Sequence, residues 1–138
     1  MQLFTSYWGN PELPHIDAVM VGISRGQPRW KLPYRYRVLD LLAPNRATFA
    51  LEDLGQFEEA YLAGLEDIGQ EVIIEALGQM AREGRGKLLV LLCWEAPGEP
   101  CHRFMAASWF REKAGIEVPE LVPGKLPRRG VADKGTLF

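Results

Sequence analysis

Short runs rich in apolar and β-branched residues alternate along this chain with longer segments in which apolar residues recur every three or four positions. The short runs are typical of strands, and they predict strands over residues 2–7, 17–23 and 87–93. A shorter final strand is expected over residues 116–121. Strands that are separated by helical segments can pair in parallel, so the alternation predicts an α/β fold.

The segments with helical periodicity predict three helices, over residues 54–67, 69–83 and about 100–114. The third should begin with Pro100, because the first helical position makes no use of the N–H that proline lacks, and should stop at Gly115. We therefore expect a small, open, mostly parallel sheet of about four strands with helices on both faces, in a Rossmann-like three-layer arrangement.

The composition fits one compact domain. The chain has 138 residues, of which 47% are hydrophobic and 25% are charged, so a single core is sufficient. We assign this domain to residues 1–121. Residues 122–138 are rich in proline, glycine and basic side chains, and we expect them to form an irregular basic arm at the C-terminus.

Cysteine content and hydropathy bear on the cellular compartment. Two cysteines are too few for a disulfide scaffold, and residues 1–6 lack the basic and apolar blocks of a secretion signal. No uncharged apolar run approaches the ~20 residues that a membrane helix needs. We therefore expect a cytoplasmic protein with reduced thiols and no membrane partner.

The charges are segregated along the chain, although the formal net charge is only -2. Residues 25–46 hold six basic side chains and one acid, with aromatic residues between them, whereas residues 52–75 hold eight acids and no lysine or arginine. Basic side chains interleaved with aromatic rings suit a nucleic-acid backbone with stacked bases, and Arg29 and Trp30 lie at the centre of this loop. Alternatively, the loop is solvated and its arginines pair with the acidic helices.

Polar residues follow three of the predicted strands where each strand ends. They are Ser6, Ser24 with Arg25, and Cys93 with Glu95. Ligands bind beyond the carboxyl ends of the strands in open parallel sheets, so these side chains should converge on one crevice. The residues expected to bind a ligand there are Ser6, Ser24, Arg25, Arg29, Trp30, Cys93 and Arg103.

Three chemically active residues, Cys101, His102 and Arg103, are expected in the first turn of the third helix. Unpaired N–H groups at a helix N-terminus favour anions, and Arg103 could clamp a phosphate or carboxylate there. Alternatively, Arg103 pairs internally with Glu95 or Glu99.

Catalytic roles are predicted for Glu95, Cys101 and His102. Glu95 could act as a general acid or base, and a helix N-terminus favours the thiolate form of Cys101. Adjacent helical residues diverge by ~100°, which weakens the case for a Cys101–His102 dyad. The alternative for Cys101 is a packed, inert thiol, and Cys93 is expected to be a small residue of the crevice wall.

Neither a metal nor a cofactor is expected. The spacing of Cys93, Cys101 and His102 matches none of the paired Cys-x-x-Cys zinc motifs, and His15 is the only other histidine. A transient disulfide between Cys93 and Cys101 has no support from the sequence pattern either.

The segments 91–95 (Leu-Leu-Cys-Trp-Glu) and 101–103 (Cys-His-Arg) resemble the Leu-Cys-x-Glu…Cys-His-Arg signature of the domain of unknown function 488 (DUF488) family. The similarity covers most of residues 2–121. Segment 23–30 is closest to a compact subgroup with an Ile-Ser-Arg-Gly-x-Pro-x-Trp loop, and Ile23 and Ser24 depart from the more general Asp-Val pattern. The resemblance implies an α/β fold and a shared site, without an established activity. The site would comprise Arg25, Cys93, Glu95, Cys101, His102 and Arg103.

Taken together, these features favour an enzyme-like domain that binds a phosphorylated or nucleic-acid-related ligand at the carboxyl ends of the strands. Two other functions stay open. One is a non-catalytic module that senses a small anion with the same pocket, and the other is a thiol-dependent enzyme that uses Cys101.

Overall fold

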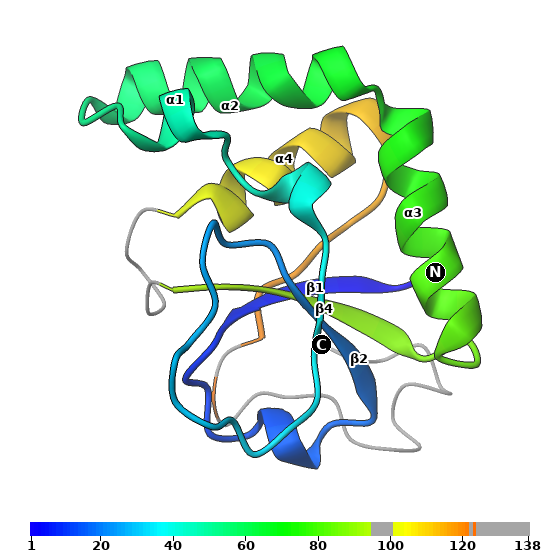
Figure 1. The fold of residues 1–138 in the computed structure, drawn as a ribbon. Coiled ribbons are helices and arrows are strands. Elements are labelled where there is room, and N and C mark those ends of the chain that lie inside the picture. Colours follow the sequence, from blue (N-terminus) through cyan, green and yellow to red (C-terminus); the bar gives the residue numbers. More distant parts are fainter. Residues whose placement is uncertain (95–100, 122, 124–138) are drawn as a thin grey trace.

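The structure is a computed structural model, and it describes residues 1–94, 101–121 and 123 (Figure 1). Within these ranges the elements follow one another in the order β1 (Leu3–Tyr7), η1 (Leu13–His15), β2 (Ala18–Gly22), β3 (Arg37–Val38), η2 (Asp40–Leu42), α1 (Arg46–Phe49), α2 (Leu54–Ile68), α3 (Gln70–Glu83), β4 (Leu88–Cys93) and α4 (His102–Ala114). The two η elements are short 3-10 helices.

The four strands form one open sheet in the order β1-β4-β2-β3, and every neighbouring pair is parallel. Strand β4 lies in the interior of the sheet, where Tyr7 of β1 is opposite Cys93 and Gly22 of β2 is opposite Leu92. Because all strands point the same way, the ends of β1, β2 and β4 lie at one edge. The predicted α/β fold with an open parallel sheet of four strands is confirmed.

The identity of the fourth strand differs from the prediction. Strand β3 consists of two exposed residues, and so it carries no apolar pattern that a sequence could reveal. Segment 116–121 instead runs beside β1 and makes a single parallel bridge, between Thr5 and Glu120. The N–H of Thr5 donates to Pro119 O (2.9 Å), and the N–H of Leu121 donates to Thr5 O (2.8 Å).

The three predicted helices correspond to α2, α3 and α4 and lie within two residues of their predicted bounds, whereas the short helix α1 was not predicted. Asp53 caps the start of α2 by accepting a hydrogen bond from the N–H of Gln56 (2.8 Å). Gly69, with φ of 93°, separates α2 from α3, and Gly115, with φ of 66°, ends α4 in the left-handed conformation that favours glycine. Helix α4 begins at His102, while Pro100 lies outside the described residues.

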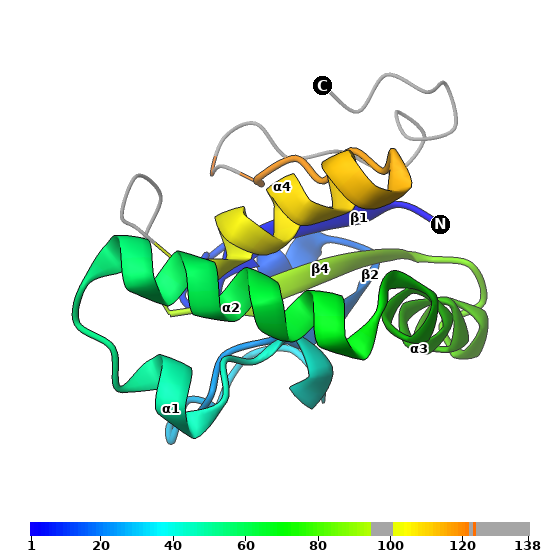
Figure 2. The ribbon, with the colours of Figure 1, turned by 90° about the horizontal axis from the view of Figure 1, so that it is seen from above.

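The two faces of the sheet are covered differently. Alternation along β4 directs Leu89, Leu91 and Cys93 to the core beneath the helices, and directs Val90 and Leu92 to the opposite core. Helices α2, α3 and α4 lie on the first face, and α4 contacts both α2 and the strands β1 and β4 (Figures 1 and 2).

The expected helical layer on the second face is replaced, among the described residues, by η1 and irregular segments. Trp8, Leu13 and Leu121 bury this face. The connection that covers it contains Pro11 and Pro14, and a proline inside a helix removes a backbone hydrogen bond. Within the described ranges, no helix is both long and apolar enough to cross a bilayer.

Gly22 permits the close contact that holds the end of β1 over β2. A Cβ atom at this position would lie 2.6 Å from Cη2 of Trp8, whose side chain is buried. We expect Gly22→Ala to lower the free energy of unfolding by about 1–3 kcal/mol, because the ring must move. Urea denaturation followed by circular dichroism measures this change.

Gly64→Ala is the matched control. No atom lies within 4 Å of a Cβ at this α2 position, so the same substitution should raise the free energy of unfolding by about 0.5–1 kcal/mol. Equal stability of Gly22→Ala and the wild type would show that Trp8 does not need this contact.

Candidate functional site

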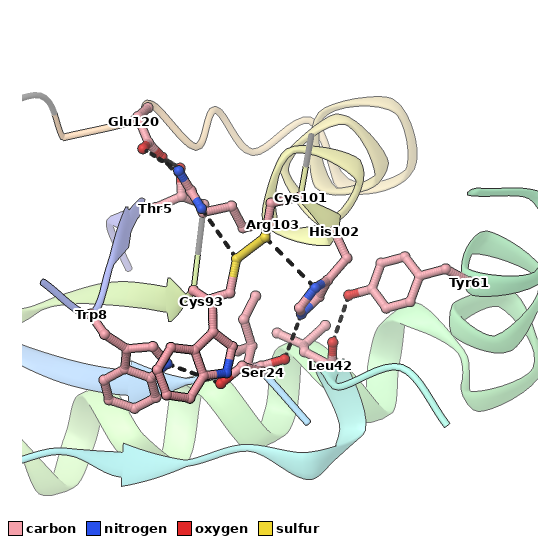
Figure 3. Close-up of a disulfide and its surroundings, with 12 residues drawn as sticks. Thr5, Trp8, Ser24, Leu42, Tyr61, Cys93, Cys101, His102, Arg103 and Glu120 are labelled. Atoms are coloured by element: carbon pink, nitrogen blue, oxygen red, sulfur yellow. Dashed lines mark hydrogen bonds and ion pairs between the residues drawn. A yellow bond between two sulfur atoms is a disulfide. The ribbon is translucent and has the colours of Figure 1, made fainter. Parts of the chain in front are cut away.

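Two cysteines meet where β4 ends and α4 begins, and they form a disulfide (Figure 3). Cys93 is the last residue of β4 and points to the face that α4 covers, while Cys101 is the N-cap residue of α4. Both cysteines of the chain are therefore bonded in this structure. Reduced thiols and a free Cys101 were expected, but the structure contains the disulfide instead. The alternation of side chains along β4 and the position of the α4 N-terminus place the two sulfur atoms together.

His102 is buried and has a fixed orientation. Its Nε2 lies 2.6 Å from the carbonyl oxygen of Ile23, and its Nδ1 lies 3.8 Å from Sγ of Cys101. A carbonyl oxygen only accepts, so Nε2 carries the hydrogen. In the neutral ring, Nδ1 then presents a lone pair to Cys101. The side of the ring is closed by Tyr61, whose ring centroid is 5.3 Å away in an edge-to-face arrangement.

The backbone explains why Cys101 and His102 meet although adjacent helical residues diverge. Cys101 has φ of -153° and ψ of 148°, which is extended rather than helical. The expected rotation of ~100° between neighbours therefore does not apply to this pair. The Cys101–His102 contact that helix geometry argued against is present.

Arg103 is entirely buried and does not open to a ligand in this structure. Its Nε and Nη2 donate to the two carboxylate oxygens of Glu120 at 3.1 and 3.0 Å, and its Nη1 donates to Sγ of Cys93 at 3.2 Å (Figure 3). Thr5 Oγ1 donates to the same carboxylate at 2.6 Å. The internal-pairing alternative thus describes Arg103 best, but with Glu120 as the partner.

Glu120 is not among the residues that the sequence pattern predicts for the site. The carboxylate stands in the short segment that lies along the edge of β1, opposite the first turn of α4. A buried arginine needs an acidic partner, and this requirement is the signal that could have pointed to Glu120. Glu95, the predicted general acid or base, and Glu99 lie outside the described residues.

The ends of the three long strands lie at the same edge of the sheet. Nε1 of Trp8 donates to Ser24 Oγ at 3.0 Å, and the ring of Trp8 lies 6.5 Å from that of Trp94. Ser24 also donates to the carbonyl of Gly26, while Ser6 donates to the carbonyl of Leu121. Both serines are buried and bonded within the protein: Ser24 joins the end of β1 to the segment after β2, and Ser6 joins β1 to Leu121.

A pocket of about 340 Å³ opens beside Cys101 and His102. Ser24 and Trp94 also line it. The charged lining residues are Arg25 and Glu52, and the apolar ones include Phe49, Phe57 and Met105. A second hollow, of about 660 Å³ between α2 and α4, also reaches Cys101. Cys101 borders both pockets, whereas Cys93 borders neither.

The predicted basic residues are divided between this pocket and the surface. Arg25 is exposed, lines the pocket and stacks over the ring of Phe49 at 5.9 Å. Arg29 and Trp30 are exposed on the loop and do not line the pocket, although the Trp30 ring contacts that of Trp94 at 5.7 Å. The structure therefore brings together Ser24, Arg25, Cys101 and His102, and leaves Arg29 outside.

The same cluster contains donor atoms that suit a metal. Sγ of Cys93, Sγ of Cys101 and a ring nitrogen of His102 all lie within 4.8 Å of one another. Thiolates and imidazole are the ligands that zinc prefers in proteins.

Comparisons with known protein families, with curated proteins and with solved structures find no match for this chain.

Burial lowers the pKa of His102, and the charge of Arg103 lowers it further, against the opposing effect of the hydrogen bond to Ile23. The folded protein thus holds a neutral ring where the unfolded chain takes up a proton below about pH 6.5. We expect the disulfide-bonded, metal-free protein to be fully stabilised above that pH and to lose stability as the pH falls through the lower folded-state value.

His102→Gln isolates this effect. Glutamine can still donate to the carbonyl of Ile23, but it does not titrate. Urea midpoints measured between pH 7.5 and 5 should fall less steeply for the variant than for the wild type. Parallel curves would show that His102 does not set the acid dependence.

Proposed function

We propose that this protein is a thiol–disulfide oxidoreductase in which Cys101 is the reactive sulfur and Cys93 is its buried partner. The observation that carries the proposal is the unequal setting of the two bonded sulfurs. Cys101 is 6% exposed and borders two pockets, whereas Cys93 is 0% exposed. An incoming thiolate therefore has better access to Cys101 than to Cys93.

Arg103 supports the role of Cys93 as the leaving group. Its Nη1 donates to Cys93 Sγ at 3.2 Å, and Glu120 holds the guanidinium in that direction with two further hydrogen bonds. When the disulfide opens, the negative charge develops on Cys93. A fixed cation beside this sulfur stabilises the leaving thiolate, and a better leaving group speeds the exchange.

His102 supports proton transfer at Cys101. Its neutral ring presents the Nδ1 lone pair 3.8 Å from Cys101 Sγ. This nitrogen can take the proton of the Cys101 thiol when that thiol attacks a disulfide, and it can return the proton when Cys101 leaves.

The reaction balances as two exchanges. A substrate thiolate bonds to Cys101 Sγ, the Cys93–Cys101 bond breaks, and Cys93 leaves as a thiolate. A second substrate thiolate then attacks the sulfur of the first substrate, and Cys101 leaves. The protein gains two electrons and becomes a dithiol, while the two substrate thiols become one disulfide; the reverse sequence reduces a substrate disulfide.

The pocket indicates the class of substrate. Its aromatic and aliphatic wall suits an apolar group, and the exposed guanidinium of Arg25 suits a carboxylate or phosphate. Glu52 lines the same pocket and would pair with an amine. A small thiol or disulfide with charged groups fits this combination.

The predicted cytoplasmic location agrees with a working disulfide, because disulfides in that compartment are usually transient and take part in redox chemistry. Membership of the domain of unknown function 488 family stays a prediction. Its Cys-His-Arg segment coincides with the residues that carry the proposal, Cys101, His102 and Arg103.

Alkylation of single-cysteine variants tests the asymmetry of the two thiols. In reduced Cys93→Ser, Cys101 should react with iodoacetamide at least roughly tenfold faster than Cys93 does in reduced Cys101→Ser, because burial limits access to Cys93. Both variants should react equally fast in concentrated urea, which serves as the control. Equal rates in the folded proteins, or a faster Cys93, would overturn the proposed roles.

A second function, binding of a nucleic-acid-related ligand, is favoured by one specific feature. Trp30 and Trp94 are 57% and 42% exposed, and their rings lie edge to face at 5.7 Å beside the basic loop. Exposed aromatic rings among cations suit stacked bases and a phosphate backbone. Arg25, Arg29, Lys31 and Arg35 are exposed on this loop, whereas Arg37 is engaged in an ion pair with Glu83.

A salt series tests this second function. Single-stranded oligonucleotides should bind with an affinity that falls as salt rises, and Arg25→Ala should reduce the slope by about 1. Trp30→Ala should weaken binding by about 1–3 kcal/mol if a base stacks there. Arg111→Ala, an exposed change near the far end of α4, is the matched control. Salt-independent binding, or equal losses in all three variants, would exclude a specific platform.

A further inference from the structure

We infer that the reduced protein binds one zinc ion through Cys93 Sγ, Cys101 Sγ and Nδ1 of His102. These are three buried donors from β4 and the start of α4, and their donor atoms all lie within 4.8 Å of one another. The site goes beyond the disulfide chemistry proposed above, since zinc binding requires only that the two sulfurs are reduced.

The separation of Cys101 and His102 suits a tetrahedral ion, whereas the two sulfurs, which are bonded to each other in this structure, must move apart on reduction. Zinc bonds of ~2.3 Å to sulfur and ~2.0–2.1 Å to nitrogen place two such ligands about 3.6 Å apart. The separation of Cys101 Sγ and His102 Nδ1 is already 3.8 Å. The Cα atoms of Cys93 and Cys101 are 7.4 Å apart, beyond the ~4.4–6.8 Å that disulfides usually span, so the backbone leaves room for reduced sulfurs on two sides of an ion.

His102 is oriented as a metal ligand should be. Histidines that bind metals almost always donate their other ring N–H to a carbonyl or carboxylate, which fixes the tautomer and the ring plane. The Nε2–H of His102 donates to the carbonyl of Ile23 at 2.6 Å, and this leaves Nδ1 with its lone pair toward the sulfurs.

The surrounding charges balance. Two thiolates neutralise a Zn²⁺ ion, and the buried Arg103 is neutralised by Glu120 through two hydrogen bonds. Arg103 also donates to Cys93 Sγ, as outer groups around a metal site commonly do. The buried cluster therefore carries no net charge when zinc is bound, which avoids the cost of an uncompensated buried ion.

The fourth position is open. In the part of the chain that the structure describes, no further histidine, cysteine or carboxylate belongs to the cluster. The pocket of about 340 Å³ is lined by two of the ligands, Cys101 and His102, so water can reach the ion from there. Three protein ligands with one exchangeable water are typical of catalytic rather than structural zinc sites.

Zinc and the disulfide exclude each other, because zinc binds the two sulfurs as thiolates, whereas the disulfide joins the same two sulfurs in a covalent bond. The oxidised protein should therefore bind no zinc at this site, and bound zinc should protect the thiols from oxidation. Each proposal can fail alone, since alkylation rates measured with excess chelator report on the thiols and do not depend on zinc.

Metal titration of the full chain tests the site. The protein is reduced with a phosphine, freed of metal with a chelator and titrated with ZnCl₂ against a chromophoric chelator without oxygen. We expect one zinc per chain, no binding by the disulfide form, and at least a roughly tenfold weaker affinity for His102→Gln. His15→Gln, which changes the exposed histidine, is the matched control and should bind as the wild type does.

Cobalt(II) supplies a second readout. It is measured on the wild type, so it does not depend on whether a variant folds. Its spectrum should show thiolate-to-cobalt charge-transfer bands and the intense visible bands of a tetrahedral site. Cys101→Ser should lose most of the charge-transfer intensity. An octahedral cobalt spectrum, no zinc uptake by the reduced protein, or equal affinities for His102→Gln and His15→Gln would overturn the inference.

Discussion

The attachment of the N-terminus of α4 to the ends of two strands is the constraint on which the site depends. A disulfide joins Cys101 to the end of β4, and one short hydrogen bond joins His102 to the carbonyl of Ile23, just after β2. These two links fix the first turn of the helix over the carboxyl edge of the sheet. They also orient the imidazole, so the same bonds that hold the fold arrange the reactive groups.

Arg103 is the centre of a buried network of charged and polar groups. Its guanidinium is fully buried between Glu120 and Cys93, and Thr5 donates to the same carboxylate. A buried ion pair of this kind stabilises little by itself, but loss of one partner costs about 3–5 kcal/mol because the other charge is left unpaired. In the proposed function, the hydrogen bond to sulfur would also let Arg103 stabilise the Cys93 thiolate. Segment 116–121 matters to the site because it brings Glu120 to Arg103.

Much of this architecture could be predicted because burial leaves a pattern in the sequence. Strand β4 is apolar throughout since both of its faces are covered, and the helical periodicity of residues 54–83 follows from packing on one face of the sheet. The meeting of the strand ends followed from parallel pairing alone. Strand β3 could not be predicted, because its two exposed residues carry no such pattern.

The details of the site depend on geometry that local patterns do not record. Whether Cys101 and His102 meet is decided by the extended backbone of the N-cap residue. The partner of Arg103 is 17 residues away in sequence and reaches it only because the chain returns along β1. The pairing of Cys93 with Cys101 likewise combines strand alternation with the position of the helix start.

If external thiols attack Cys101, a mixed disulfide on this residue should form first, and it can be trapped. The disulfide-bonded protein is mixed with glutathione, quenched with acid within seconds and mapped by peptide mass spectrometry. We expect a glutathione adduct on Cys101 and a free thiol at Cys93. An adduct on Cys93, or an intact disulfide after prolonged exposure of the folded protein, would contradict it.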